Sequence, residues 1–275
     1  MASRFTGFLA IGVVSLAVSA GAQAPQRRLT VDLVYDSQAR INFGGTPAPD
    51  ITWLDADNYL LVQRAERGVD WLKVDAASGR TTPFFDQSRM EAAIAAVPGV
   101  SRDDSGRMAR SNDFTLNAAR TAALFSIGDD LYSYDIPSNR TVRLTSAAGT
   151  EEEATFSPDG RRVAFVRGNN LYLVDVASQR EQAVTTDGSS EILNGKLDWL
   201  YQEEIYGRGR FRAYWWSPDS TRVAFLQLNE RPVPEYTVVD HIPYRPEIEV
   251  TDYPKAGDPN PTVRLGLGAT TGGAP

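Results

Sequence analysis

A repeated pattern of short strands and tight turns constrains this chain more than any other sequence feature. The clearest copy spans residues 154–185 and contains Ser-Pro-Asp-Gly at 157–160, followed by apolar strands predicted at 162–166 and 170–175. Pro presets φ and Gly supplies positive φ, so this tetrapeptide predicts a turn. A second copy at 214–226 repeats the order of aromatic residues, Ser-Pro-Asp and Val-Ala-Phe. Four short antiparallel strands cannot bury both faces alone, which favours radial stacking as a β-propeller.

Two weaker copies precede these, at 51–75 and 114–135. The equivalent residues Phe114 and Phe156 are 42 positions apart, a spacing typical of propeller blades. A β-sandwich also uses short strands and tight turns, but the shared motif order favours the propeller. The sequence therefore predicts an all-β fold, a partial β-propeller of about four to five four-stranded blades, with a further blade-like pattern beginning at Pro261.

Composition excludes several classes of site. The 275 residues include no Cys and one His, His241, and carry a formal net charge of −7. A disulfide framework, a thiolate metal site and a cysteine nucleophile are thus impossible, and no metal or cofactor is predicted. The acidic balance argues against nucleic-acid binding. We interpret His241 as a structural or surface residue.

The N-terminus has the pattern of a secretory signal peptide. Arg4 precedes an apolar run over residues 5–18, and Ala-Gly-Ala at 20–22 is a small-residue cleavage site. We predict a signal peptide at 1–22 and an exported mature chain at 23–275, periplasmic or secreted. The alternative is an uncleaved membrane anchor. No other segment is long and apolar enough to span a bilayer.

Two segments interrupt the strand pattern. Residues 88–97 have a helix-rich composition and end at Pro98, which predicts a surface helix between the first two blades. About 18 extra residues between Ser190 and Tyr214 form an insertion, because Phe156 and Trp216 are 60 positions apart.

The insertion holds the candidate site. We expect Asp198 to cap a short helix that Trp199, Leu200 and Ile205 anchor to the propeller, with Glu203 and Glu204 at its exposed end. Adjacent residues on a regular helix face different ways, so two carboxylates serving one ligand would require a bent backbone. The Gly-Arg-Gly sequence at 207–209 makes such a bend possible. The alternative is that the pair belongs to a solvated helix face.

Several motifs resemble the N-terminal propeller of the dipeptidyl peptidase IV family. They are Asp-Trp-Leu-Tyr-Gln-Glu-Glu-Ile-Tyr at 198–206, Tyr-Trp-Trp-Ser-Pro-Asp-Ser at 214–220 and Val-Ala-Phe-Leu-Gln-Leu-Asn at 223–229. Tyr-Pro-Lys-Ala-Gly at 253–257 and Asn-Pro-Thr-Val at 260–263 add to the match. The resemblance covers residues 40–265 and is strongest from 190 to 265.

This resemblance implies an exported serine exopeptidase that releases X-Pro or X-Ala dipeptides, with residues 23–275 forming part of an eight-bladed ring. It implies that Glu203 and Glu204 bind the α-amino group of a peptide substrate. Residues 230–252 resemble the arm that the family uses for dimerisation, with a plain long hairpin as the alternative. For the family Arg that contacts the substrate carbonyl the candidates are Arg140 and Arg143, but the spacing does not settle which of them, if either, corresponds to it, so we assign this role to neither.

The family's catalytic motif is absent from the sequence. There is no Gly-x-Ser-x-Gly, and Ser157 and Ser217 belong to turns, where their hydroxyls serve local hydrogen bonds. We therefore expect the C-terminal α/β-hydrolase domain to lie outside this chain, which should not hydrolyse peptides by itself. The alternative from another class is a stand-alone periplasmic TolB-like propeller that acts as a binding scaffold.

Overall fold

The computed structural model describes residues 28–36, 38 and 51–272. The predicted signal peptide at 1–22 lies outside these residues. The chain divides into two compact units, 1–48 and 49–275. In the first, helix α1 (Val31–Tyr35) begins after Thr30, whose Oγ1 accepts a hydrogen bond from the Leu33 amide at 3.2 Å. None of the helices in the described residues has the length and apolar character that a membrane span requires.

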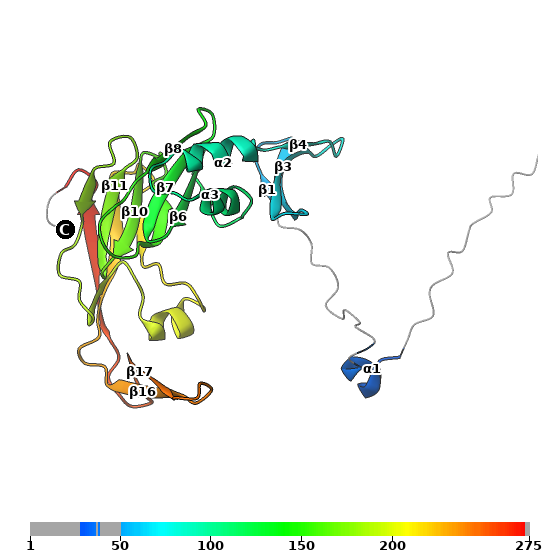
Figure 1. Ribbon diagram of the computed structural model, residues 1–275. Coiled ribbons are helices and arrows are strands. Elements are labelled where there is room, and N and C mark those ends of the chain that lie inside the picture. The colour runs from blue at the N-terminus through cyan, green and yellow to red at the C-terminus, as the bar shows by residue number, and fades with distance from the viewer. Residues whose placement is uncertain (1–27, 37, 39–50, 273–275) are drawn as a thin grey trace, which may run out of the picture. The chain divides into compact units, whose positions relative to one another are not determined.

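The second unit contains four four-stranded antiparallel sheets and one two-stranded sheet (Figure 1). The first four-stranded sheet contains β1 (Ile51–Trp53), β2 (Asn58–Arg64), β3 (Val69–Asp75) and β4 (Thr81–Pro83). The second contains β5 (Thr115–Leu116), β6 (Ala122–Ile127), β7 (Asp130–Asp135) and β8 (Arg140–Arg143). The third contains β9 (Glu152–Phe156), β10 (Arg162–Arg167), β11 (Asn170–Asp175) and β12 (Glu181–Ala183). In each, the strands pair in chain order as a meander. The prediction of an all-β partial propeller is confirmed.

The fourth sheet is assembled differently. It contains β13 (Ile192–Asn194), β14 (Tyr214–Trp216), β15 (Arg222–Asn229) and β18 (Thr262–Ala269). We expected a further blade-like pattern from Pro261, but β18 pairs with β15 over its whole length, from Arg222 opposite Ala269 to Asn229 opposite Thr262. The described residues therefore hold four blades. The hairpin of β16 (Glu235–Asp240) and β17 (Glu247–Asp252) forms a separate two-stranded sheet between β15 and β18 in the chain.

The Ser-Pro-Asp turns close by the same hydrogen bonds in the third and fourth sheets. Ser157 Oγ donates to Asp159 Oδ1 at 2.6 Å and accepts from the Arg162 amide at 3.0 Å. Ser217 Oγ makes the equivalent bonds, to Asp219 Oδ1 at 2.6 Å and from the Arg222 amide at 2.9 Å. These contacts confirm the expected role of both hydroxyls in local hydrogen bonding.

Apolar side chains join each sheet to the next. The first and second sheets share a core that includes Leu60, Trp71, Phe125 and Tyr134. The second and third share Leu124, Leu131, Val163, Phe165 and Val174, and the third and fourth share Val166, Leu171, Tyr214, Val223 and Phe225. Since the second and third sheets each contribute to the cores on both of their faces, the four sheets stack as the blades of a propeller do.

Two helices fill the junction between the first two sheets. Helix α2 (Gln87–Ala95) occupies the segment where we predicted a surface helix, but Met90 and Ile94 are completely buried. Helix α3 (Arg102–Ala109), which we did not predict, buries Met108 in the same core. A helix is thus present at the surface of the inter-blade connection as predicted, with Ser88, Arg89 and Ala92 exposed and one face packed into the junction.

Replacing Ile94 with Ala should lower the free energy of unfolding by about 2–5 kcal/mol, since it leaves a cavity in a closely packed core. Urea unfolding followed by tryptophan fluorescence would measure the change. The matched control is Ala92→Ser on the exposed side of the same helix, which should change stability by less than about 0.5 kcal/mol. An equally small effect of Ile94→Ala would contradict the packing described.

Hydrogen bonds also cross from the third sheet to the fourth. The buried Tyr214 hydroxyl contacts Thr155 Oγ1 and the Ala164 carbonyl, each at 2.9 Å, and donates to the Glu153 carbonyl. Trp216 Nε1 donates to the same Thr155 hydroxyl at 3.1 Å. Burial raises the pKa of Tyr214, so this hydroxyl stays protonated and keeps its donor. The first strands of two blades are thereby held together next to the insertion.

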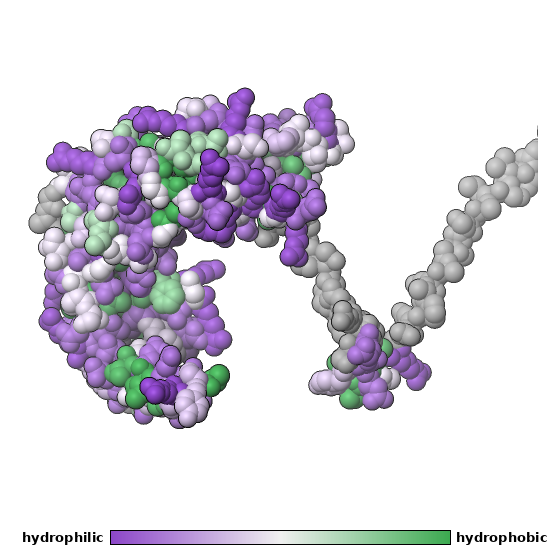
Figure 2. Space-filling model, viewed as in Figure 1, coloured by the Kyte–Doolittle hydropathy of each residue, from purple (hydrophilic) through white to green (hydrophobic). Residues whose placement is uncertain are grey.

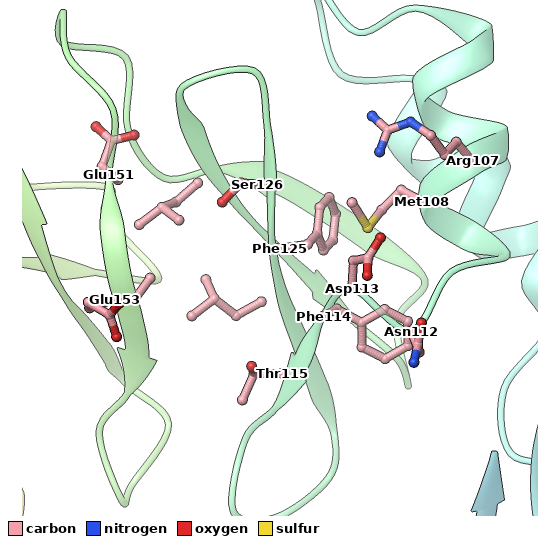
Figure 3. A pocket seen from close by; sticks show the side chains of 13 residues that line it. Arg107, Met108, Asn112, Asp113, Phe114, Thr115, Phe125, Ser126, Glu151 and Glu153 are labelled. Atoms are coloured by element: carbon pink, nitrogen blue, oxygen red, sulfur yellow. The ribbon is translucent and has the colours of Figure 1, made fainter. Parts of the chain in front are cut away.

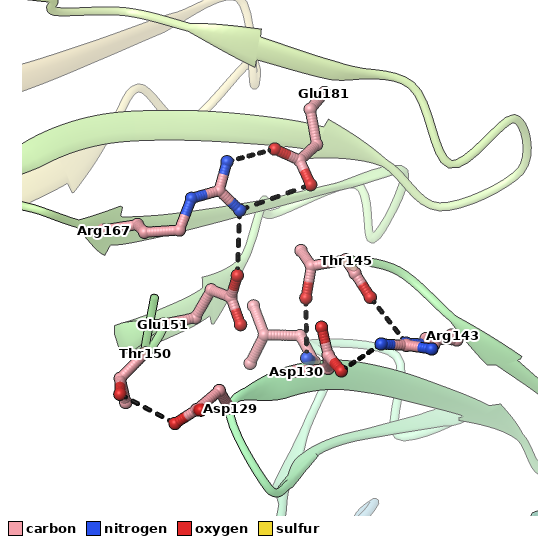
Figure 4. Close-up of polar contacts among 9 residues, drawn as sticks. Asp129, Asp130, Arg143, Thr145, Thr150, Glu151, Arg167 and Glu181 are labelled. Atoms are coloured by element: carbon pink, nitrogen blue, oxygen red, sulfur yellow. Dashed lines mark hydrogen bonds and ion pairs between the residues drawn. The ribbon is translucent and has the colours of Figure 1, made fainter. Parts of the chain in front are cut away.

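A buried ion-pair network ties the third sheet to the loop that precedes it (Figure 4). The Arg167 guanidinium donates to Glu151 Oε1 at 2.9 Å and to Glu181 Oε2 at 2.5 Å. It also lies 4.6 Å from the ring centroid of Tyr172. The side chains of Glu151 and Arg167 are 0% and 11% exposed, so these charges are almost completely removed from water.

Candidate functional site

The insertion interrupts one edge strand of the fourth sheet, between β13 and β14. Both β13 and β14 pair with β15, with Asn194 opposite Gln227 and Tyr214 opposite Phe225. Residues 195–213 therefore project from a single edge, and an isolated bridge between Lys196 and Arg212 joins the two ends of the loop. A small core of Leu193, Leu197, Ala213 and Leu228 buries its base. The insertion thus starts and ends at fixed positions.

The helical turn begins as predicted, at Asp198. Asp198 Oδ1 accepts a hydrogen bond from the Tyr201 amide at 2.9 Å. The turn that follows is π-helical, η1 (Tyr201–Ile205), and the Tyr206 amide donates to the Tyr201 carbonyl at 2.8 Å. Single π turns are rare and frequently occur at functional sites.

The glycines after the turn close it back on itself. Gly207 and Gly209 have φ of 95° and 77°, values that residues with side chains rarely adopt. The Gly209 amide donates to Oε1 of the buried Gln202 at 2.8 Å. The backbone of this turn is wider and more bent than that of a regular helix. Two adjacent carboxylates that serve one ligand require a local bend of this kind.

The predicted anchors are correct only in part. The Trp199 ring packs against Tyr253 with centroids 4.5 Å apart, and Leu200 is half-buried. Tyr201, which we did not predict as an anchor, packs against the small core at the base. Ile205, which we expected to be an anchor, is 59% exposed. The wider π turn changes the rotation between successive residues, so the regular helical spacing used in the prediction does not apply.

Glu203 and Glu204 both lie on this turn and differ in environment. The Glu203 side chain is 18% exposed, and its Oε1 pairs with Arg208 Nε at 2.5 Å. Glu204 is exposed and has no ion pair among the residues that the structure describes. The pair thus offers one partly buried and one open carboxylate. Contact with a peptide ammonium group stays a prediction.

Of the two arginines left open, Arg143 has structural partners. It donates to the Asp130 carboxylate and, through Nε, to the Thr145 carbonyl at 2.9 Å (Figure 4). Arg140 is exposed at the start of β8. His241 is exposed in the loop between β16 and β17, in accord with a surface role.

A cavity of about 480 Å³ lies between α3, β6 and the start of the third sheet. Figure 3 shows Arg107 and Met108 on one side and Glu151 and Glu153 on the other. Glu153 has a φ of 56° next to a register shift in β9, as at a β-bulge. Burial raises the pKa of both glutamates. Sequence reasoning missed this cavity, although the run Glu-Glu-Glu at 151–153 before a strand was an available signal.

A second cavity, of about 490 Å³, adjoins the insertion and the base of the β16–β17 hairpin. Asp198 and Glu230 line it and are 5% and 8% exposed. Burial raises the pKa of both carboxyls, and for Glu230 the charges of Asp198 and Asp252 add to the effect, so that its pKa is about 7. Within the described ranges, no three Asp, Glu or His side chains are arranged to hold a metal ion.

The raised pKa of Glu230 predicts a pH-dependent stability. The folded chain binds this proton more tightly than the unfolded chain, so the stabilisation is fully present below pH 4.5 and is lost as pH rises through 7. The loss is about 3 kcal/mol at most. Urea unfolding at pH 5 and pH 8 should show a smaller difference for Glu230→Gln than for the unmodified chain. The exposed Glu247→Gln serves as the control, and identical pH profiles for all three proteins would disprove the assignment.

Comparison with known proteins places the chain in a family. Residues 115–275 match the family described as the dipeptidyl peptidase IV (DPP IV) N-terminal region. A probable dipeptidyl peptidase 4 of Aspergillus clavatus is 40% identical over 144 residues, covering 50% of this chain and 18% of the relative. A probable dipeptidyl-aminopeptidase B of Talaromyces stipitatus is 30% identical over 269 residues, covering 89% of this chain and 29% of the relative.

Solved structures agree with these relatives. Dipeptidyl peptidase 4 of Porphyromonas gingivalis superposes with a TM-score of 0.65 at 28% identity, covering 90% of this chain and 34% of that one. A putative dipeptidyl aminopeptidase IV from Bacteroides ovatus shares the fold, with a TM-score of 0.57 over 80% of this chain. The chain spans less than a third of the length of these curated relatives. From the family match together with the blade architecture, we conclude that this chain belongs to the family of dipeptidyl peptidase IV N-terminal regions.

Proposed function

We propose that this chain is the N-terminal propeller portion of an exported dipeptidyl peptidase IV-like serine exopeptidase. The whole protein would remove X-Pro or X-Ala dipeptides from peptide N-termini. The observation that carries the proposal is the adjacent pair Glu203 and Glu204 on a π turn with a buried base, in a chain that belongs to this family.

The chemistry of the pair suits a peptide N-terminus. An ammonium group has three donors, and two carboxylates can accept charge-assisted hydrogen bonds from it. Arg208 occupies one oxygen of Glu203, so the ammonium would bind beside this arginine or displace it. Fixing the N-terminus at a set distance from a nucleophile selects the second peptide bond for cleavage. It also lowers the activation barrier, because the substrate loses its orientational freedom on binding and not in the reaction step.

The remaining parts of the proposal concern the whole protein. Residues 1–22 would be the signal peptide, 23–275 the propeller that controls access, and the α/β-hydrolase domain with its Ser, Asp and His would lie outside this chain. Homodimerisation would use the β16–β17 hairpin, where Figure 2 shows hydrophobic side chains at the surface. The exposed apolar residues of this segment are Tyr236, Val238, Val239, Ile242, Tyr244, Ile248 and Val250.

Substrates with free and blocked N-termini test the proposed function. The full-length protein should hydrolyse Gly-Pro-p-nitroanilide, whereas its N-acetylated form should be a poor substrate because it lacks the ammonium charge. Release of p-nitroaniline gives kcat/KM for both. Equal hydrolysis of the two compounds would show that no N-terminal ammonium is recognised, and hydrolysis of neither would contradict the peptidase assignment.

A further inference from the structure

The cavity beside the insertion has a charged floor and no cation to balance it. Its lining includes five carboxylates and no basic side chain. Those carboxylates belong to Glu191, Asp198, Glu230, Glu235 and Asp252. Carboxylates from the insertion, from the end of β15 and from the β16–β17 hairpin therefore face one space of about 490 Å³.

The two most buried carboxylates of this cavity, Glu230 and Asp198, have few hydrogen-bond partners and no ion pair among the described residues. Glu230 is 8% exposed, and its side chain has no hydrogen-bond or ion-pair partner among the described residues. One oxygen of Asp198 accepts from the Tyr201 amide, and the described residues supply it no cation. Burying a carboxylate without a partner is costly, so such a site is stabilised either by a proton or by a bound cation.

The guanidinium group of Arg231, which lies near this cavity, forms an ion pair at the rim. Arg231 Nε pairs with Glu191 Oε2 at 3.1 Å, and both side chains are more than half exposed. This pair leaves four carboxylates without an ion pair in the part of the chain that the structure describes. The cavity therefore keeps an excess of negative charge at its floor and on the hairpin side.

One aromatic side chain lines the cavity and belongs to a run of three packed rings. The Trp199 indole lines the cavity and packs against Tyr253, which in turn packs against Tyr236 at 5.6 Å. Lys255 Nζ lies 4.3 Å from the Tyr236 ring centroid, so this aromatic run already holds one ammonium group. Carboxylates combined with an aromatic face bind organic cations through charge and cation–π attraction.

We propose that this cavity binds an organic cation, an alkylammonium or alkylguanidinium group, between the Glu230 and Asp198 carboxylates and the Trp199 ring. An organic cation fits better than a metal ion, because no three carboxylates of the described residues converge at metal-ligand geometry. The site does not depend on the proposed peptidase activity and uses neither Glu203 nor Glu204.

Cation binding is coupled to protonation. A bound cation keeps Glu230 ionised, so affinity should increase as pH rises through about 7. Asp198, Asp252, Glu235 and Glu191 face the same space. Of the basic groups nearby, Arg231 is paired with Glu191 at the rim, and the Lys255 ammonium lies over the Tyr236 ring. None of these groups replaces the missing counter-charge at Glu230.

Calorimetric titration of the full-length protein with agmatine, which carries both cationic groups, tests the proposal. We expect saturable one-to-one binding at pH 8, at least about tenfold weaker at pH 5.5 because most of Glu230 is then protonated. Glu230→Gln should weaken binding at pH 8 by at least about tenfold, while Glu247→Gln, which removes the same charge from an exposed position on the hairpin, should not. Trp199→Leu should weaken it by a smaller factor.

Several outcomes would overturn the proposal. They are no saturable binding, equal affinity of the Glu230→Gln and unmodified proteins, reproduction of the heat signal by NaCl at matched ionic strength, or displacement of agmatine by an equal concentration of Ca²⁺. Sedimentation velocity distinguishes the two sources of the cation. If agmatine dissociates a self-associated form, a basic side chain of a second copy is the natural ligand; if the sedimentation coefficient is unchanged, the ligand is a free amine. Both results require the same site.

Discussion

In the full-length protein, the double variant Glu203→Gln/Glu204→Gln should lower kcat/KM for Gly-Pro-p-nitroanilide by about 10²–10⁴-fold. Each substitution keeps the shape of the side chain and removes its charge. A hydrogen bond to a charged group contributes about 1.5–3 kcal/mol, and each 1.36 kcal/mol corresponds to a factor of ten in rate. Loss of two such bonds therefore accounts for the expected range.

The single variants should differ. Glu203 is 18% exposed, so solvent screens its charge less, and Glu203→Gln should have the larger effect. Glu66→Gln, on the exposed turn between β2 and β3, is the matched control and should leave kcat/KM unchanged. Full activity of the double variant would refute the assigned role. An equal loss with the N-acetylated substrate would refute recognition of the ammonium group.

The second large effect is expected at Arg167. Replacing it with Met should lower the free energy of unfolding by about 3–5 kcal/mol, because the variant leaves the buried Glu151 carboxylate without its cation. Glu151 is fully buried at the side chain, and its Oε2 has no hydrogen-bond partner. Guanidinium chloride would screen ion pairs, so urea unfolding is the appropriate measurement.

A rescue variant separates the lost charge from lost packing. Adding Glu151→Gln and Glu181→Gln to Arg167→Met should recover much of the stability, since neutral partners no longer carry the desolvation cost of a buried charge. Arg231→Met, which breaks the exposed pair with Glu191, should cost no more than about 1 kcal/mol. If Arg167→Met cost as little as Arg231→Met, the network would not contribute as described.

The local elements of this protein follow from short stretches of sequence. The turns at Ser157 and Ser217, the strands between them and the cap at Asp198 all depend on residues no more than five positions apart. Turn and capping chemistry acts over that range, as does the alternation of apolar residues in a strand. The blade pattern and the position of the insertion were therefore predictable from residue types and spacing alone.

Tertiary structure decided which of these elements are neighbours. Strand β18 belongs to the fourth sheet because β15 offers it a free edge, although about thirty residues separate the two strands in sequence. One face of helix α2 is buried because the first two blades pack against it, and the spacing of Met90 and Ile94 does not say which elements cover that face. Pairing and burial depend on partners that are distant in the chain, and no local pattern encodes them.

The same division holds for the sites. The sequence by itself determined that Glu203 and Glu204 lie on an inserted turn next to flexible glycines. Only the tertiary structure decided that the turn is π-helical, that one carboxylate is partly buried, and that Asp198, Glu230 and Asp252 line one cavity. The physical reason is that a carboxylate's environment is set by the segments that fold against it, which here come from the insertion, the end of β15 and the hairpin.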